Sequence, residues 1–105
     1  MPWLLLATAG LLEIVFAFAM KSSEGFTRWL PALVTVATGV ASVILLSVSL
    51  KTIPVGTGYA VWTGIGAVGT AVVGILALGD SATPARIACI ALILFGIIGL
   101  RLVPA

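Results

Sequence analysis

The chain has 105 residues, of which 62% are hydrophobic and only 8% are charged. Soluble domains carry about 25% charged residues, and a soluble fold of this chain would leave much of its apolar surface in water, which the hydrophobic effect opposes. The composition therefore predicts a protein that is embedded in a lipid bilayer. The net charge of +2 is too small to suggest nucleic acid as a partner. With no His and a single Cys, we expect neither a metal site nor an intrachain disulfide.

Four long apolar runs, separated by short polar connections, make up almost the whole chain. They cover residues 3–20, 29–50, 55–78 and 85–103. Because a helix needs roughly 20 residues to cross a bilayer, we expect four transmembrane helices that form one domain over residues 1–105. The runs are apolar on all sides, whereas the strands of a membrane β-barrel alternate between polar and apolar residues. The predicted fold class is therefore an all-α membrane protein.

The basic residues at the two ends of the predicted bundle are nearly balanced. Short connections make successive helices antiparallel, which places Lys51 and Arg101 at one end. The other end has Lys21, Arg28 and Arg86. An excess of Lys and Arg on the cytoplasmic side orients membrane proteins, and here the excess is close to zero. Either other factors fix one orientation, or the chain inserts in both and forms an antiparallel dual-topology dimer, which would supply the inverted repeats that transporters commonly use.

Glu13 is the one acidic residue inside an apolar run. A carboxylate at mid-membrane costs at least ~2.5 kcal/mol, and no Lys or Arg occurs at any position from 2 to 20. Its neighbours on the helix surface include Gly10 and Phe16, so that a second helix or a ligand has room to approach. One interpretation is a protonated side chain that makes a structural hydrogen bond. The other is a site that alternates between binding a proton and binding a cation.

The third run contains an aromatic pair and a glycine pair. Tyr59 and Trp62 lie three residues apart and share a helix face. Aromatic faces attract cations, and the hydroxyl and indole N–H can orient a carboxylate. An interfacial aromatic belt is the alternative, which fits Tyr59 better than the deeper Trp62. Gly64 and Gly66 favour either a hinge in the helix or close helix packing.

Small and polar residues mark the other two runs. Ser42 lies mid-span in the second run. Its hydroxyl is expected either to bond back to a carbonyl of the preceding turn or to donate to the Glu13 carboxylate. The fourth run carries small residues that form either a close helix–helix seam or a surface facing lipid. These are Ala85, Ala88, Cys89 and Gly96.

Taken together, these residues resemble the small multidrug resistance family across essentially the whole chain. The segments that carry the resemblance are 9–14, 20–28 and 53–66, which read AGLLEI, MKSSEGFTR and IPVGTGYAVWTGIG. The resemblance implies an antiparallel homodimer in the bacterial inner membrane that exchanges protons for a hydrophobic or guanidinium-type cation. Both Glu13 carboxylates would then share one site. The proton gradient would drive the exchange, without a cofactor.

Within the family, the chain most resembles the guanidinium-exporter branch. The support lies in segments 51–54, 63–69 and 95–100, which read KTIP, TGIGAVG and FGIIGL. The residues that match the site of that branch are Glu13, Ser42, Tyr59 and Trp62. Phe16 departs from it, because the branch usually has Trp there, and Cys89 stands where Gly or Ala is expected.

The loss of the indole donor at position 16 predicts a looser and more hydrophobic site. A broad exporter of quaternary ammonium and other hydrophobic cations is therefore the first alternative function. The second is a small membrane subunit that does not transport. A heterodimer with a second homologous chain is an alternative to the homodimer.

Overall fold

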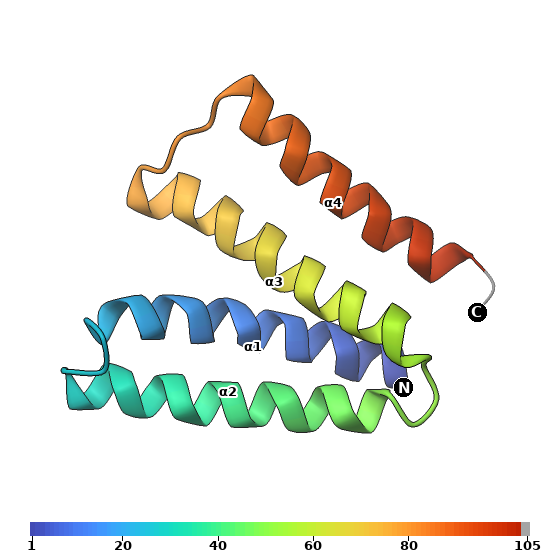
Figure 1. Ribbon diagram of the computed structural model, residues 1–105, viewed down its shortest axis with the longest axis horizontal. Coiled ribbons are helices and arrows are strands. Elements are labelled where there is room, and N and C mark those ends of the chain that lie inside the picture. Colours follow the sequence, from blue (N-terminus) through green and yellow to red (C-terminus); the bar gives the residue numbers. More distant parts are fainter. Residues whose placement is uncertain (104–105) are drawn as a thin grey trace.

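The computed structural model describes residues 1–103, which form four α-helices and no β-strand (Figure 1). They are α1 (Pro2–Ser22), α2 (Trp29–Ser49), α3 (Val55–Leu78) and α4 (Pro84–Leu102). Each helix is long and apolar enough to cross a membrane. The predicted all-α membrane fold is confirmed.

The helix ends have clear local causes. Pro2 and Pro84 lie in the first turns of α1 and α4, where the missing N–H of proline breaks no helical hydrogen bond. At α4 the Thr83 hydroxyl accepts a hydrogen bond from the backbone N–H of Arg86 at 3.3 Å, which is the usual contact of an N-cap residue. The helix α3 ends at Gly79, whose φ of 72° is a left-handed conformation that glycine adopts without steric cost.

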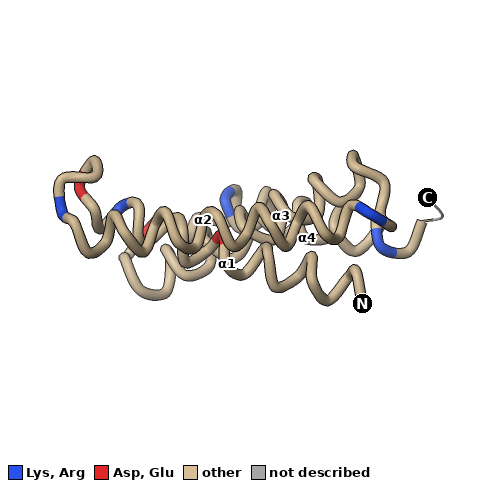
Figure 2. The backbone as a smooth tube through the Cα atoms, turned by 90° about the horizontal axis from the view of Figure 1, so that it is seen from below, with Lys and Arg blue, Asp and Glu red and all other residues tan. Residues whose placement is uncertain are grey.

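The four helices form a thin slab rather than a closed bundle. The helix α1 packs closely against α2 and also against α3, whereas the backbone of α4 comes close only to that of α3 and forms the outer edge (Figure 1). The slab measures 43 × 35 × 17 Å, and Figure 2 shows it from the side. None of the residues of α4 is buried. The helix α1 begins and α4 ends at the same end of the slab, as antiparallel helices require (Figure 1).

Glycine residues set how closely α3 approaches its neighbours. A Cβ atom at Gly64 would lie 2.6 Å from Cδ1 of Ile97 in α4, and one at Gly66 would lie 3.0 Å from Cβ of Glu13 in α1. The first separation is shorter than real Cβ contacts and the second is tighter than most of them, so a larger residue at either position would push the facing side chain away. The helix α3 continues through both glycines without interruption. Close packing is thus observed at this pair, and its use as a hinge stays a prediction.

Candidate functional site

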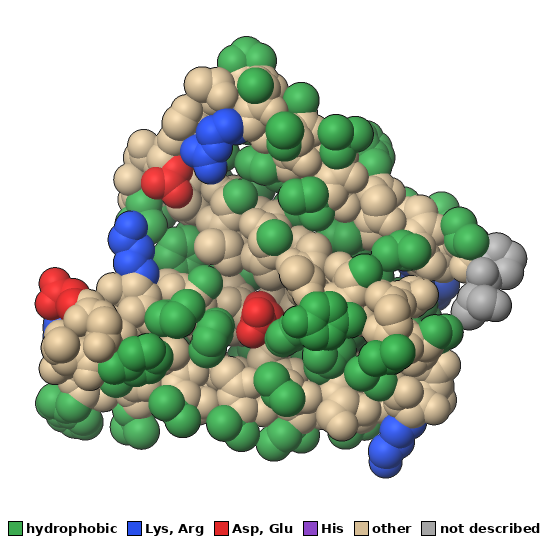
Figure 3. All heavy atoms as spheres, viewed as in Figure 1, with side chains coloured by type: hydrophobic (Ala, Val, Ile, Leu, Met, Phe, Trp, Pro, Cys, Tyr) green, Lys and Arg blue, Asp and Glu red, His purple; other side chains and the backbone are tan. Residues whose placement is uncertain are grey.

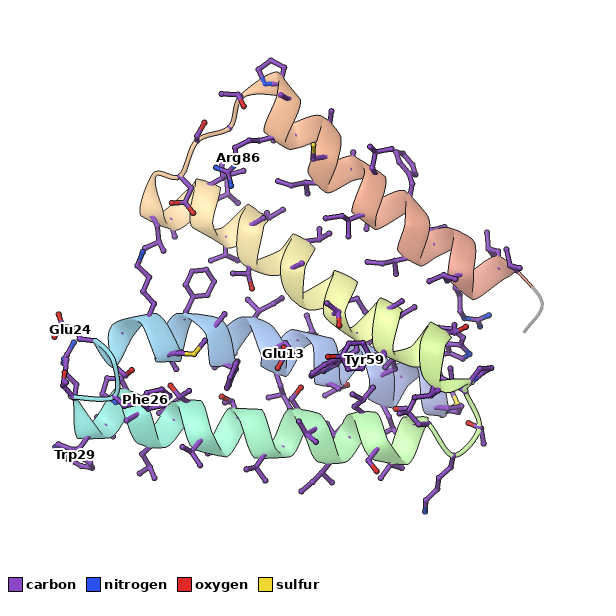
Figure 4. The ribbon with its side chains drawn as sticks, in the orientation of Figure 1. Glu13, Glu24, Phe26, Trp29, Tyr59 and Arg86 are labelled. Carbon is purple, nitrogen blue, oxygen red and sulfur yellow. The ribbon has the colours of Figure 1, made fainter. Side chains whose placement is uncertain are left out.

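Glu13 lies near the middle of α1, on the side that packs against Gly66 of α3. Figure 3 shows one acidic side chain in the middle of a largely apolar face, at the place that Figure 4 labels Glu13. Two hollows border this side chain, and Phe16 lines both of them.

The first hollow, here called the α1–α2 hollow, has a volume of about 570 Å³. Its walls include Glu13, Phe16, Phe26, Gly39, Val43 and Trp62. Apart from Glu13 and Thr35, its walls are aliphatic, aromatic or glycine. This hollow therefore combines one carboxylate with an apolar and aromatic surface, which suits a cation that carries hydrocarbon groups.

The second hollow, here called the α1–α3 hollow, has a volume of about 540 Å³ and is more polar. Its walls include Glu13, Thr63, Gly66, Thr70, Asp80 and Arg86. Thr63 and Thr70 lie seven residues apart, which places them on one face of α3. This hollow joins the middle of the slab to the charged connection between α3 and α4, so Glu13 has polar surroundings on one side and apolar surroundings on the other.

Ser42 links three helices beside Glu13. Its side chain is fully buried, and its hydroxyl donates to the carbonyl oxygen of Ala9 in α1 at 2.8 Å. The indole N–H of Trp62 in α3 donates to the same hydroxyl at 2.9 Å. The hydroxyl thus serves once as donor and once as acceptor. Both expectations for Ser42 were wrong, because the small side chain of Ala9 lets α2 approach the α1 backbone one turn before Glu13.

Tyr59 and Trp62 pack edge to face. Their ring centroids lie 5.3 Å apart, with the ring planes at 62°, an arrangement that aromatic pairs favour. Trp62 is half-buried and lines the α1–α2 hollow together with Glu13. Tyr59 is 56% exposed and lies outside that wall. The structure therefore brings Trp62 to the candidate site and places Tyr59 outside that wall, in contact with the indole.

Phe16 fits into a notch in α2. A Cβ atom at Gly39 would lie 2.9 Å from Cε1 of the Phe16 ring, so the ring occupies space that only glycine leaves open. Gly39 was not among the predicted site residues, and neither was Thr35. Their spacing relative to Ser42 could have predicted both residues. Positions 35, 39 and 42 lie on one helix face, and all carry small or hydroxyl-bearing residues. The other predicted site residue of α1, Gly10, packs against Ile65 instead.

Phe26 is a further wall residue that the sequence analysis missed. It lies in the connection between α1 and α2 with φ of 65°, a left-handed conformation that costs a non-glycine residue roughly 1–2 kcal/mol. Its backbone N–H donates to the Ser23 hydroxyl at 3.0 Å, and that hydroxyl donates to the carbonyl of Met20 at 2.6 Å. Ser23 is fully buried. The serine thus holds Phe26 at the edge of the α1–α2 hollow.

The predicted seam residues of α4 are exposed. All four positions are open to the surroundings, and a Cβ atom at Gly96 would meet nothing within 4 Å. By contrast, the next residue, Ile97, packs against Gly64. The stripe formed by Ala85, Ala88, Cys89 and Gly96 is therefore open in this chain, and its role as a dimer seam stays a prediction.

Residues 1–93 match the protein family described as Small Multidrug Resistance protein. The chain belongs to this family of small membrane transporters, as its motifs predicted, and its four apolar helices make it a multi-pass protein of the bacterial inner membrane. It is similar to proteins named Guanidinium exporter in Citrobacter freundii, Salmonella typhimurium and Yersinia pseudotuberculosis serotype I. Each is 55% identical over 102 residues, which cover 97% of this chain and 97% or 98% of the relative.

Proposed function

We propose that this protein is a proton-coupled antiporter that exports guanidinium or small substituted guanidinium ions. The names of its relatives support the substrate. The observation that carries the mechanism is the position of Glu13, the one acidic side chain inside a membrane helix, at the junction of an apolar hollow and a more polar hollow. An ionisable group at this depth is a functional site by default, because its cost requires a compensating role.

The exchange follows from the charge of the carboxylate. Loss of the proton from Glu13 creates a negative charge that attracts a cation, and return of a proton removes that charge and releases the cation. A planar guanidinium suits a carboxylate, because two parallel N–H groups can each donate to one oxygen. Since the proton and the cation occupy the same group in turn, binding of one excludes the other, and the two movements are coupled.

Ser42 and Trp62 act on this site through the backbone. The indole N–H is already donated to Ser42 and the serine hydroxyl to Ala9, so neither donor is directed at the carboxylate in this structure. They hold the turn of α1 that precedes Glu13. The face of the Trp62 ring, which lines the α1–α2 hollow, remains available to a bound cation. Tyr59 packs against that ring in an edge-to-face pair.

The working unit that we propose is an antiparallel homodimer in which two Glu13 side chains share one site. The near balance of basic residues between the two ends supports insertion in both orientations. The open stripe of small residues on α4 supports a seam with a second copy. Pairing with a homologous partner chain instead of a second copy would use the same stripe.

A second candidate function is export of quaternary ammonium ions. The observation that favours it is the wall of the α1–α2 hollow, where Phe16 offers a ring without a donor and the volume of about 570 Å³ leaves room for hydrocarbon groups. A quaternary ammonium ion has no N–H group, so it would bind through charge and aromatic faces alone.

Electrical recording on protein reconstituted in liposomes tests both functions. We expect a current when guanidinium is added to the wild type, and none with Glu13→Gln, which keeps the shape of the side chain but cannot release a proton. Equal currents from guanidinium and from a tetraalkylammonium ion would favour the broader exporter. An unchanged current in Glu13→Gln, or none in the wild type with any cation, would instead favour the non-transporting subunit.

A further inference from the structure

The last turn of α4 contacts the first turn of α1 through the side chains of Arg101 and Trp3. The guanidinium carbon of Arg101 lies 4.7 Å from the centroid of the Trp3 ring, a cation–π contact. Along the rest of its length, α4 packs on α3 and its backbone stays distant from that of α1. The contact therefore fixes a flexible arginine side chain at the end of the slab that carries the termini, where the membrane surface lies if the four helices span the bilayer.

A third hollow lies directly beside this pair. The α1–α4 hollow has a volume of about 320 Å³, and its walls include Trp3, Ala7, Val61, Ile65, Ile97 and Arg101. All its lining side chains except Arg101 are aliphatic or aromatic. The hollow therefore has an apolar body in the depth of the membrane and a single cation at the level of the membrane surface.

The charges of the chain leave this cation without an acidic side chain nearby. The three acidic residues of the sequence are Glu13, Glu24 and Asp80. Glu13 lies mid-span in α1, and the other two lie in the connections at the opposite end of the slab. In Figure 2 the end with the termini shows basic residues and no acidic one. A guanidinium binds phosphate through two parallel hydrogen bonds. The positive charge of Arg101 is also complementary to an anionic headgroup.

We propose that the α1–α4 hollow binds an anionic phospholipid. One acyl chain lies along Ala7 and Ile97, and the phosphate is bound by the guanidinium of Arg101. The Trp3 ring restrains the guanidinium through the cation–π contact, which uses none of its N–H groups and leaves them free to bind the phosphate. This site is separate from Glu13 and does not depend on which cation the protein exports.

Native mass spectrometry of the detergent-purified full chain tests the proposal, with phosphatidylglycerol and phosphatidylcholine of the same acyl chains as probes. We expect the wild type to bind phosphatidylglycerol more tightly than phosphatidylcholine. Arg101→Gln should weaken phosphatidylglycerol binding about tenfold, since charge-assisted hydrogen bonds are lost. Lys51→Gln is the matched control, because it removes a basic residue from the same end but not from this hollow.

A second variant tests the acyl chain independently of charge. Ala7→Phe fills the α1–α4 hollow and keeps Arg101, so it should also release phosphatidylglycerol. Circular dichroism and cation-driven current in phosphatidylcholine liposomes should stay at the wild-type level in all three variants, which separates lipid binding from folding and transport. The proposal is overturned if the two lipids bind equally, if Lys51→Gln weakens binding as much as Arg101→Gln, or if Ala7→Phe retains the lipid. Failure of the wild type to bind either lipid, as a second copy covering the hollow would cause, also overturns it.

Discussion

The indole N–H of Trp62 and the hydroxyl of Ser42 form a hydrogen bond of 2.9 Å between α3 and α2. The same hydroxyl reaches the carbonyl of Ala9 in α1. Three helices are thus joined by one buried oxygen, a single turn before the carboxylate that we propose to bind protons and cations. Changes at Ser42 or Trp62 are expected to act on stability and on the position of Glu13 together.

We expect Ser42→Ala to lower the free energy of unfolding in detergent by about 1–3 kcal/mol, because it leaves the half-buried indole N–H without its acceptor. Trp62→Phe removes the donor together with its bond, and Ser42 keeps its bond to Ala9. The loss of this hydrogen bond should therefore lower the free energy of unfolding less in Trp62→Phe than in Ser42→Ala. Ser47→Ala, in an exposed position of the same helix, is the control. Denaturant titration followed by circular dichroism measures the difference, and equal stability of the variants at 42 and 47 would contradict the network.

Gly66→Ala should reduce guanidinium-driven current about tenfold, which corresponds to roughly 1.4 kcal/mol. The added methyl group would lie 3.0 Å from Cβ of Glu13 and force the acidic side chain to move. Gly56→Ala adds the same methyl group to the same helix where nothing lies within 4 Å. Its current should match the wild type. A Gly66→Ala protein that transports normally would show that the close approach of α1 and α3 is not needed for exchange.

Phe26→Ala should weaken transport of cations with large hydrocarbon groups, such as phenylguanidinium, and leave guanidinium unchanged. The reason is that Phe26 lies at the edge of the α1–α2 hollow, away from the carboxylate. We expect KM for the larger cation to rise about tenfold, the effect of losing roughly 1.4 kcal/mol of contact. Ser23→Ala should also raise KM for the larger cation, but by less, because it removes the hydroxyl that accepts the Phe26 backbone N–H and leaves the phenyl ring in place.

Trp29→Ala controls for the loss of an aromatic side chain near this connection. Trp29 is 76% exposed and does not line the hollow, so both cations should keep their wild-type KM. If Phe26→Ala raises KM for guanidinium as strongly as for phenylguanidinium, the ring acts on the whole site and not on the hydrocarbon part.

Phe16→Trp should shift selectivity toward guanidinium and away from tetraalkylammonium ions. The larger indole narrows the α1–α2 hollow beside Glu13 and restores a donor that the phenyl ring lacks. The ratio of the two currents should change several-fold, with the tetraalkylammonium current falling. Phe18→Trp, on the same helix but outside both hollows at Glu13, should leave the ratio unchanged. No shift in Phe16→Trp would show that position 16 does not select the substrate.

The four helices were predictable because lipid allows so few solutions. Long apolar runs must satisfy their own backbone hydrogen bonds, and the helix does so within one segment. Glu13 was equally visible, since a carboxylate in such a run is costly. Neither argument fixes the rotation of a helix about its axis, because these helices are apolar all round.

The rotation depends instead on which small residues meet, and these contacts are made by residues far apart in the chain. The Ser42 hydroxyl points to Ala9 because of the close approach of α1 and α2, which no local pattern in either run specifies. Phe26 was not predicted as a wall residue for a different reason. Its place depends on a left-handed backbone at a residue type that rarely adopts it, held by the buried Ser23 hydroxyl.

The packing of α4 mainly on α3 has a consequence for how the protein is made. A ribosome synthesises α1, α2 and α3 before it reaches Pro84, so Ala9, Ser42 and Trp62 are all in the nascent chain before α4 exists. The hydrogen-bond network beside Glu13 can therefore assemble during translation before the last helix adds Arg86 to the wall of the α1–α3 hollow. The helix α4 enters the membrane last and packs on a surface of α3 that is already folded, so the stripe that we propose as the seam with a second chain is the last part to form.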